Sequence, residues 1–329
     1  MYRAVLSGFA ASLLAVAAAA TGSAQTASAP DTYPSHPAQI VVPFPPGGNT
    51  DILTRIMADQ FTTALKQTFT VVNKPGAGAN IGATFVANSD PDGYTILMAP
   101  PATHAINAYL YNNLPFDMEK SFAPITVVAR FPNVMVVHPS LGVKTLEELI
   151  AKAKANPGKI DFATSGVGST SHLCISLFMA MAGIEMNHIP YKGTSQSLQD
   201  VITGRVGLMI DNLGPILPHI QSGALLAIGV STADPVSLLP GVPPIATVVK
   251  GYQASSWNAL SVPAKTPRST VMKLSTEAQA ALTKPEVIEK MRSIGSEPVG
   301  GSPDDAEKFF AEERTRWKRA VEVAKLPKL

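Results

Sequence analysis

Residues 43–51 read PFPPGGNTD and connect an apolar run at residues 40–44 to a long helical pattern. The prolines restrict the backbone on the way into the turn, and the glycines allow positive φ angles and close approach of a ligand to the backbone. Asn49 or Thr50 could cap the helix, whose first N–H groups lack partners and, with the helix dipole, can bind an anion. Taken alone, this loop is equally compatible with a simple turn between a strand and a helix.

Two more loops of this kind occur further along the chain. KPGAGAN at residues 74–80 and SGVGSTS at residues 165–171 each follow a strand-like run and precede a helical pattern. None of the three loops contains the G-x-x-x-x-G-K-[ST] sequence of a nucleotide-binding loop, and the glycine spacing of the last two differs from G-x-G-x-x-G. Three glycine-bearing helix starts therefore predict an anionic group, a carboxylate rather than a nucleotide phosphate, held between two lobes.

Strand-like and helix-like runs alternate between residues 40 and 230, which is typical of an α/β fold. The expected strands lie at residues 40–44, 69–72, 94–98, 122–129, 134–137, 160–163, 188–190, 206–211 and 224–230. Residues 235–265 are rich in proline and glycine, and three helices follow. In two of them Thr266 and Ser302 are the expected caps, each followed by a first-turn proline. The pattern predicts two lobes, each a mostly parallel sheet flanked by helices. Lobe 1 is expected to contain residues 31–130 and 230–329, and lobe 2 residues 131–229.

The first 24 residues are typical of a secretory signal peptide. Arg3 lies near the start, an apolar run follows at residues 5–20, and small residues precede Gln25. This run is shorter than the roughly 20 residues that a membrane-spanning helix needs. We therefore expect an exported, soluble and monomeric protein in the periplasm.

Net charge, cysteine content and histidine spacing limit which partners and cofactors can be expected. The formal net charge of +2 shows no electrostatic footprint for nucleic acid or an anionic membrane surface, so a small molecule is the expected partner. The single cysteine, Cys174, excludes an intramolecular disulfide. The six histidines show no metal-ligand spacing, so neither a metal nor another cofactor is expected.

Six stretches of the chain resemble conserved stretches of a known protein family. They are PFPPGGNTD, NKPGAGANIG, THAIN, FATSGVGSTSHL, HIPYKGTSQSLQD and LPGVPPIATV, in this order along the chain. Together they resemble the successive signatures of Bug-type solute receptors, the periplasmic substrate-binding proteins of tripartite tricarboxylate transporters. The resemblance implies a type II, Venus-flytrap binding protein without enzymatic activity, which closes over a small carboxylate and passes it to inner-membrane transporter subunits.

The resemblance also implies which residues bind the ligand. In such receptors the carboxylate is held mainly by backbone N–H groups and waters at the glycine loops, with the second lobe closing over it. The residues at the matching positions are Phe44 as an apolar wall, Pro46, Gly47, Gly48, Asn49, Gly78, Ala79, Ser165, Gly166 and Ser169. The chain departs from the family at Ala79, where a glycine is common, and the alanine could narrow the backbone angles or change nothing.

Side chains outside the loops leave alternatives open. Asp211 ends a predicted strand, where α/β sheets place ligands, and could accept an ammonium group from an amino-acid ligand or cap the next helix. His172 could support the binding loop or be a structural histidine, and Lys192 could add charge to the site or be an ordinary exposed lysine. A hydrolase using Ser169, His172 and Asp211 is a weaker hypothesis, because Ser169 lies at an expected cap and G-x-S-x-G is absent. A third hypothesis is a receptor that presents its ligand to a membrane sensor.

Overall fold

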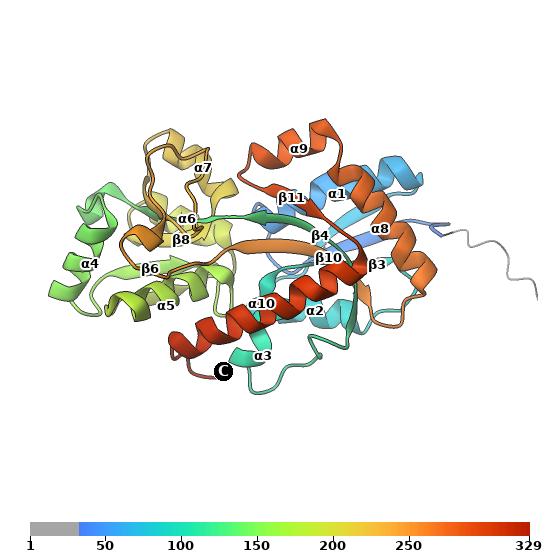
Figure 1. The fold of residues 1–329 in the computed structure, drawn as a ribbon, viewed down its shortest axis with the longest axis horizontal. Coiled ribbons are helices and arrows are strands. Elements are labelled where there is room, and N and C mark those ends of the chain that lie inside the picture. The colour runs from blue at the N-terminus through green and yellow to red at the C-terminus, as the bar shows by residue number, and fades with distance from the viewer. Residues whose placement is uncertain (1–32) are drawn as a thin grey trace, which may run out of the picture. The chain divides into compact units, whose positions relative to one another are not determined.

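Two β-sheets, each flanked by helices, organise the chain (Figure 1). The computed structural model describes residues 33–329, so the signal peptide expected at residues 1–24 lies outside the described residues. The first sheet has the spatial order β11 (Glu297–Gly300), β4 (Phe122–Phe131), β10 (Ser256–Pro263), β3 (Thr95–Ala99), β1 (Ala38–Val42) and β2 (Phe69–Asn73). The second has the order β7 (Asn187–Pro190), β6 (Asp161–Thr164), β8 (Leu208–Asn212), β5 (Asn133–Val137) and β9 (Leu226–Val230). The two-lobed α/β fold predicted from the sequence is confirmed.

Each sheet is mixed, which corrects the expectation of mostly parallel sheets. β1 pairs in parallel with β2 and β3, and β6 pairs in parallel with β7 and β8. In the first sheet β4, β10 and β11 join their neighbours antiparallel, and in the second sheet β5 pairs antiparallel with β8 and β9. The parallel pairs come from local βαβ units, whereas the antiparallel strands lie where the chain crosses between the sheets or returns near its C-terminus.

The chain crosses between the sheets twice. β4 leads directly into β5 through Pro132, and residues 231–255 return the chain from β9 to β10. Figure 1 shows β4 and β10 as long neighbouring ribbons that reach from the first sheet toward the second. The lobe boundaries expected at residues 130 and 230 stay a prediction.

Helices cover the sheets and connect the strands. Their bounds are α1 (Asn49–Leu65), α2 (Asn80–Ala87), α3 (Asn107–Leu110), α4 (Leu146–Ala155), α5 (Thr170–Ala182), α6 (Thr194–Ile202), α7 (Leu213–Gln221), α8 (Arg268–Leu282), α9 (Pro285–Arg292) and α10 (Pro303–Val323). α1 packs on β1, β2 and α8, while α5 and α6 pack on β8. The long C-terminal helix α10 contacts both β4 and α5, so it touches elements of both sheets (Figure 1). Within residues 33–329, no helix combines the length and the apolar character that crossing a membrane requires.

The C-terminal helices form as predicted, with one corrected start. Ser302 Oγ accepts a hydrogen bond from Asp305 N at 3.1 Å, and the Asp305 carboxylate accepts one from Ser302 N at 3.0 Å, so α10 begins with a capping box. α8 begins after Pro267 and has no side-chain cap. The predicted Thr266 cap is wrong, because the Thr266 hydroxyl turns back and donates to the carbonyl oxygen of Pro263 at 2.7 Å.

A buried carboxylate joins β10 to α10. Glu313, only 2% exposed, accepts hydrogen bonds from the indole nitrogens of Trp257 at 2.8 Å and Trp317 at 3.1 Å. Arg316 forms an ion pair with the same carboxylate at 3.1 Å. Because buried indoles need a hydrogen-bond acceptor, Glu313 fixes α10 to a strand that crosses between the sheets.

Candidate functional site

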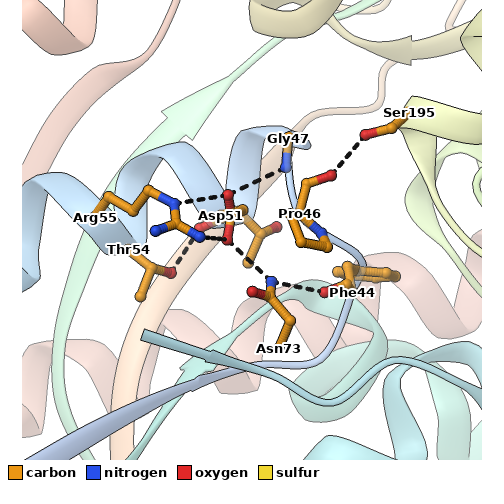
Figure 2. A network of polar contacts seen from close by, with 9 residues as sticks. Phe44, Pro46, Gly47, Asp51, Thr54, Arg55, Asn73 and Ser195 are labelled. Carbon is orange, nitrogen blue, oxygen red and sulfur yellow. Dashed lines mark hydrogen bonds and ion pairs between the residues drawn. The ribbon is translucent and has the colours of Figure 1, made fainter. Parts of the chain in front are cut away.

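The loop before α1 is held by Asp51, which lies in the first turn of the helix (Figure 2). Asp51 Oδ2 accepts hydrogen bonds from Gly47 N at 3.1 Å and from Arg55 Nε at 3.0 Å. Its Oδ1 accepts from Asn73 Nδ2 at 2.9 Å, and the same amide donates to the carbonyl oxygen of Phe44 at 3.0 Å. The loop, the helix and β2 therefore converge on one buried carboxylate, which fixes the path of the loop.

The charge of Asp51 is maintained despite its burial. Burial by itself would raise the pKa of this carboxyl group, but hydrogen bonds from Arg55, Asn73 and the Gly47 N–H outweigh it and lower the pKa below the ordinary aspartate value. Asp51 is therefore ionised at neutral pH, and its oxygens serve to position the loop.

α1 begins without a side-chain cap, which corrects the expectation that Asn49 or Thr50 would provide one. The N-cap residue is Gly48, with φ −81° and ψ 168°. Asn49 Nδ2 instead donates to Ser296 Oγ at 3.3 Å. The first bond of the helical ladder runs from Ile52 N to the carbonyl oxygen of Gly48, so the N–H groups of Asn49 and Thr50 have no partner within the helix.

A small cavity of about 20 Å³, here called the inner cavity, lies where α1 begins. Its walls include the starts of four helices, with Asn49 at α1, Thr170 at α5, Thr194 at α6 and Asn212 just before α7. Its other lining residues are Phe44, Pro45, Gly48, Thr50, Pro100, Ala102, Ser165, Ser169 and Ser256. All four helix starts carry the positive end of a helix dipole, although at α7 the N–H groups of Asn212 and Leu213 are already bonded to Asp211 Oδ1 and the carbonyl oxygen of Pro132, and this convergence from both lobes favours an anion. The cavity has room for about one water-sized group, so the two lobes are closed over it.

A second space of about 230 Å³, here called the outer cavity, shares Phe44 and Ser165 with the inner one. Its other lining residues are Gly76, Ala77, Gly78, Ala79, Tyr111, Gly166, Val167, Pro190, Tyr191 and Lys192. Phe44 is thus an apolar wall common to both cavities, and Lys192 contributes a cation to the outer one. The two cavities therefore adjoin at Phe44 and Ser165.

The second glycine loop has an unfavourable backbone conformation. A short 3₁₀ helix (Ala77–Ala79) forms it, and its three residues have φ values of 48°, 60° and 80° in order. Positive φ is costly for alanine, so the chain accepts strain at Ala79 rather than avoiding this conformation. Asn107 Nδ2 holds the loop by donating to the carbonyl oxygen of Gly78 at 2.8 Å. A Cβ atom at Gly78 would lie 2.6 Å from the carbonyl oxygen of Val167, so this glycine lets the loops of the two lobes touch.

Two stacked histidines, His172 and His188, hydrogen-bond residues in and next to the third glycine loop, residues 165–171. Gly168 N donates to His172 Nδ1 at 3.4 Å, and Thr164 Oγ1 hydrogen-bonds His188 Nε2 at 2.7 Å. The two imidazole rings stack with centroids 4.5 Å apart. Burial lowers the pKa of His172 to about 3, with a further contribution from His188, and burial lowers the pKa of His188 to about 4. Both rings are therefore neutral at neutral pH, as the acceptor role of His172 requires.

Asp211 lies behind the wall of the inner cavity and is fully buried. Its Oδ2 accepts a hydrogen bond from Thr194 Oγ1 at 3.1 Å and its Oδ1 accepts one from Asn212 N at 2.8 Å, and the Ser165 side chain also bonds the carboxyl group. Burial raises the pKa of Asp211 to about 6, although these hydrogen bonds oppose the shift. The predicted capping role is wrong, because β8 continues one residue further and Asn212 is the N-cap of α7.

Most of the predicted binding residues lie around the two cavities. The inner cavity is lined by Phe44, Gly48, Asn49, Ser165 and Ser169, and the outer cavity by Phe44, Gly78, Ala79, Ser165 and Gly166. Pro46 and Gly47 belong instead to a contact between the lobes. The carbonyl oxygen of Pro46 accepts a hydrogen bond from Ser195 Oγ at 2.7 Å (Figure 2), and a Cβ atom at Gly47 would lie 3.0 Å from the same hydroxyl oxygen.

Five polar residues of the inner cavity were not predicted as ligand-binding residues: Thr50, Thr170, Thr194, Asn212 and Ser256. Thr194 had a usable signal, because Gly193-Thr194 repeats the pattern of a glycine between a strand and a helix start. Asn212 lies one residue beyond the end predicted for its strand. Ser256 had no such signal, since it begins β10, which lies in the segment interpreted as irregular.

Ser169, His172 and Asp211 do not form a catalytic triad. Ser169 Oγ donates to the carbonyl oxygen of Gly166 at 2.6 Å and caps α5 by accepting from the backbone N of His172 at 3.2 Å. The imidazole of His172 accepts from Gly168 N. Because none of these bonds joins the serine hydroxyl to the imidazole, the geometry gives the hydrolase hypothesis no support.

Comparison with known proteins identifies the family. The profile described as "Tripartite tricarboxylate transporter family receptor" matches residues 53–326. The chain belongs to this receptor family. It is similar to protein BugT of Bordetella pertussis, with 37% identity over 295 residues that cover 88% of this chain and 90% of BugT. A protein from the tcbD-tcbE intergenic region of Pseudomonas sp. strain P51 is 34% identical over 311 residues, which cover 94% of this chain and 92% of that protein. The predicted resemblance to Bug-type receptors is confirmed.

Solved structures of similar proteins share the two-lobed architecture. The R. palustris protein Rpa4515 with adipate gives a TM-score of 0.88 at 36% identity and covers 90% of this chain and 100% of its own. The periplasmic binding protein BugD gives 0.86 at 32% identity, with 90% of this chain and 100% of its own covered. MatC from Rhodopseudomonas palustris with bound malate gives a TM-score of 0.84 at 26% identity and covers 88% of this chain and 100% of its own. The protein is thus a solute-binding receptor of a periplasmic family.

Proposed function

We propose that this receptor captures a small carboxylate in the periplasm and delivers it to the membrane subunits of a tripartite tricarboxylate-type transporter. The mature protein would begin after residue 24 and act as a monomer. Family membership supports the link to a transporter, and two similar structures hold the carboxylates adipate and malate.

The convergence of four helix starts on the inner cavity is the observation that carries this proposal. Asn49 and Thr50 offer backbone N–H groups without partners in α1, and α5, α6 and α7 begin on the opposite side of the same cavity. A carboxylate accepts hydrogen bonds from such groups and is stabilised by the helix dipoles. Within residues 33–329, no arginine or lysine lines the inner cavity, so backbone amides are the natural source of its positive potential.

Eight of the predicted binding residues then have a role at the ligand, whereas Pro46 and Gly47 join the two lobes and Asp211 lies behind the cavity wall. The carboxylate binds to the loop of Gly48 and Asn49, while Ser165 and Ser169 close over it from the second lobe and Gly166 lies at the outer cavity. The list is completed by Phe44, which forms the apolar wall, and by Gly78 and Ala79, which face the remainder of the ligand in the outer cavity.

Closure of the lobes supplies the signal for delivery. Ser195 Oγ bonds the carbonyl oxygen of Pro46 across the lobes, and the inner cavity has room for only about one water-sized group. A carboxylic acid therefore enters only when the lobes separate, and its bound state differs in shape from the empty open state. Membrane subunits can distinguish the two states by this difference.

A thermal-shift screen of carboxylic acids tests the binding step. A ligand at about 100 times its dissociation constant stabilises the folded state by about 2.7 kcal/mol, so a true ligand raises the melting temperature clearly. The amide of each active acid is the control and should give no shift. If no acid stabilises the protein, or acid and amide act equally, carboxylate capture is contradicted. For delivery, cells lacking this gene and cells lacking the membrane subunits should lose uptake of the same radiolabelled acid.

A further inference from the structure

Two large apolar side chains on α2 face the solvent. Ile81 is 54% exposed and Phe85 is 38% exposed, and their spacing of four residues puts them on the same face of the helix. Of the seven exposed large apolar side chains in the described part of the chain, only these two lie one turn apart on one helix. A Cβ atom at Gly82 would lie 2.8 Å from Pro43 Cβ and 2.9 Å from the carbonyl oxygen of Lys74. This close packing fixes the rotation of α2, so the helix cannot turn to bury the pair.

The pair lies at the edge of the outer cavity. Gly76 lines this cavity, and a Cβ atom at Gly76 would lie 2.6 Å from Ile81 Cδ1. Lys192 lines the same cavity from the second lobe. Among the described residues, those that line the outer cavity include none from the two chain crossings, whereas the inner cavity is lined by Ser256, the first residue after the second crossing. Lobes joined at these crossings therefore open on the side of the outer cavity.

Two lysines without carboxylate partners border the same region. Lys74 Nζ lies 4.0 Å from the centroid of the Phe85 ring, and Lys192 is exposed on the other lobe. Neither side chain takes part in an ion pair with another described residue. An apolar pair bordered by such cations is complementary to a partner whose apolar side chain is flanked by carboxylates, because opposite charges steer association and like charges oppose it.

We propose that Lys74, Ile81, Phe85 and Lys192, here called the rim surface, bind the membrane subunit that accepts the acid. The partner is a periplasmic segment of that subunit with an apolar side chain between acidic residues. The first three residues come from the lobe of the first sheet and Lys192 from the lobe of the second, so a segment that touches both fits only one separation of the lobes. The receptor then docks with its outer cavity facing the subunit. This proposal rests on the proposed function and identifies the surface used in delivery.

Uptake by energised proteoliposomes that contain the membrane subunits tests the proposal. The purified mature receptor is added outside, with a radiolabelled acid from the thermal screen at saturating concentration. The double variant Ile81→Ser, Phe85→Ser should raise the receptor concentration needed for half-maximal uptake by at least about tenfold, because a few apolar anchors carry most of the energy of an interface. Lys74→Glu should also raise it, more at low than at high ionic strength, since salt screens the charge.

Two matched controls separate docking from general effects of the substitutions. Met272→Ser removes an apolar side chain that is 39% exposed on α8, and Lys290→Glu reverses an exposed charge on α9. Both should leave the half-maximal receptor concentration unchanged. Because Lys74, Ile81 and Phe85 line neither cavity, all variants should bind the acid in calorimetry about as tightly as the unchanged protein. Thermal unfolding checks that each variant folds, and either rim variant is sufficient for the test.

The outcomes separate this proposal from the proposed function. Unchanged half-maximal concentrations in both rim variants, with the acid still bound, overturn the rim surface and leave delivery intact. Vesicles of phosphatidylglycerol and phosphatidylethanolamine without the subunits should not bind the receptor. Binding to them that a rim variant abolishes would assign the surface to membrane lipid, and dimerisation that a rim variant abolishes would assign it to a second copy; either overturns the proposal. Uptake that does not need the receptor contradicts the proposed function instead.

Discussion

Gly48→Ala should weaken carboxylate binding without weakening the fold. Gly48 has φ −81° and ψ 168°, a conformation that alanine adopts without strain. A Cβ atom there would lie 3.8 Å from Thr194 Oγ1, an ordinary van der Waals contact, so the protein itself has room for it. Gly48 and Thr194 both line the inner cavity, and its volume of about 20 Å³ means that a single methyl group fills it.

The expected effects on stability and affinity have opposite signs. Replacing glycine by alanine at a compatible position stabilises a protein by about 0.4 to 1 kcal/mol, through the lower entropy of the unfolded chain. A carboxylate displaced from the α1 amides loses at least one charge-assisted hydrogen bond, worth about 1.5 to 3 kcal/mol, which corresponds to a roughly ten- to hundredfold weaker affinity. Gly168→Ala is a poorer probe, because φ is 82° and the new Cβ would lie 2.9 Å from Asn107 Oδ1.

Calorimetry with an acid identified by the thermal screen, together with thermal unfolding of the ligand-free proteins, measures both effects. Lys74→Ala is the control for loss of a nearby charge. Lys74 Nζ lies 4.0 Å from the centroid of the Phe85 ring, and a surface cation contributes little to a site it does not line, so binding should change by less than about 1 kcal/mol. Unchanged affinity in Gly48→Ala, or loss of binding in Lys74→Ala, would refute the amide-binding argument.

Three further predictions concern stability, each measured by thermal or denaturant unfolding of the ligand-free protein. Asp211→Asn should stabilise the fold above about pH 6 and have little effect near pH 4. Burial raises the pKa of Asp211 to about 6 in the folded state, so the unfolding free energy of the unchanged protein falls as the pH rises from about 4 to 6. Equal effects of the substitution at both pH values would count against this. Glu313→Ala should cost about 2 to 6 kcal/mol, because it leaves the buried indole N–H groups of Trp257 and Trp317 unpaired, and a loss below about 1 kcal/mol would contradict this. Ala79→Gly should stabilise by up to about 1 kcal/mol by relieving a φ of 80°, and a lower melting temperature would show that the alanine is not strained.

The local part of the fold was predictable because its signals are local. Strands and helices between residues 40 and 230 repeat the apolar patterns of βαβ units, and most predicted ends lie within a few residues of the observed ones. β10 was missed because SWNALSVP follows a segment rich in proline and glycine, and its two antiparallel partners, β3 and β4, are distant in sequence. The missed strand accounts for antiparallel pairs in the first sheet only. In the second sheet the antiparallel strand is β5, which was predicted but whose direction depends on the crossing from β4.

The site was predictable where backbone chemistry defines it. The glycine loops can be recognised from their composition, and two of the glycines predicted there, Gly48 and Gly78, do line the cavities. The positioning role of Asp51 was not found, because it depends on hydrogen bonds to Asn73 and Arg55 that one sequence does not reveal. The position of Asp211 was not predictable either, because it depends on tertiary hydrogen bonds to Thr194 and Ser165, which line the cavity while Asp211 itself does not.

An amide ¹H–¹⁵N NMR titration with the most stabilising acid tests the central claim most directly. If a carboxylate binds at the start of α1, the N–H signals of Asn49 and Thr50 should shift strongly downfield as they donate hydrogen bonds to it. Signals around Ser165 and Ser169 should change at the same ligand concentrations, because the second lobe closes over the same group. Saturable binding that leaves the Asn49 and Thr50 signals unchanged would contradict the account.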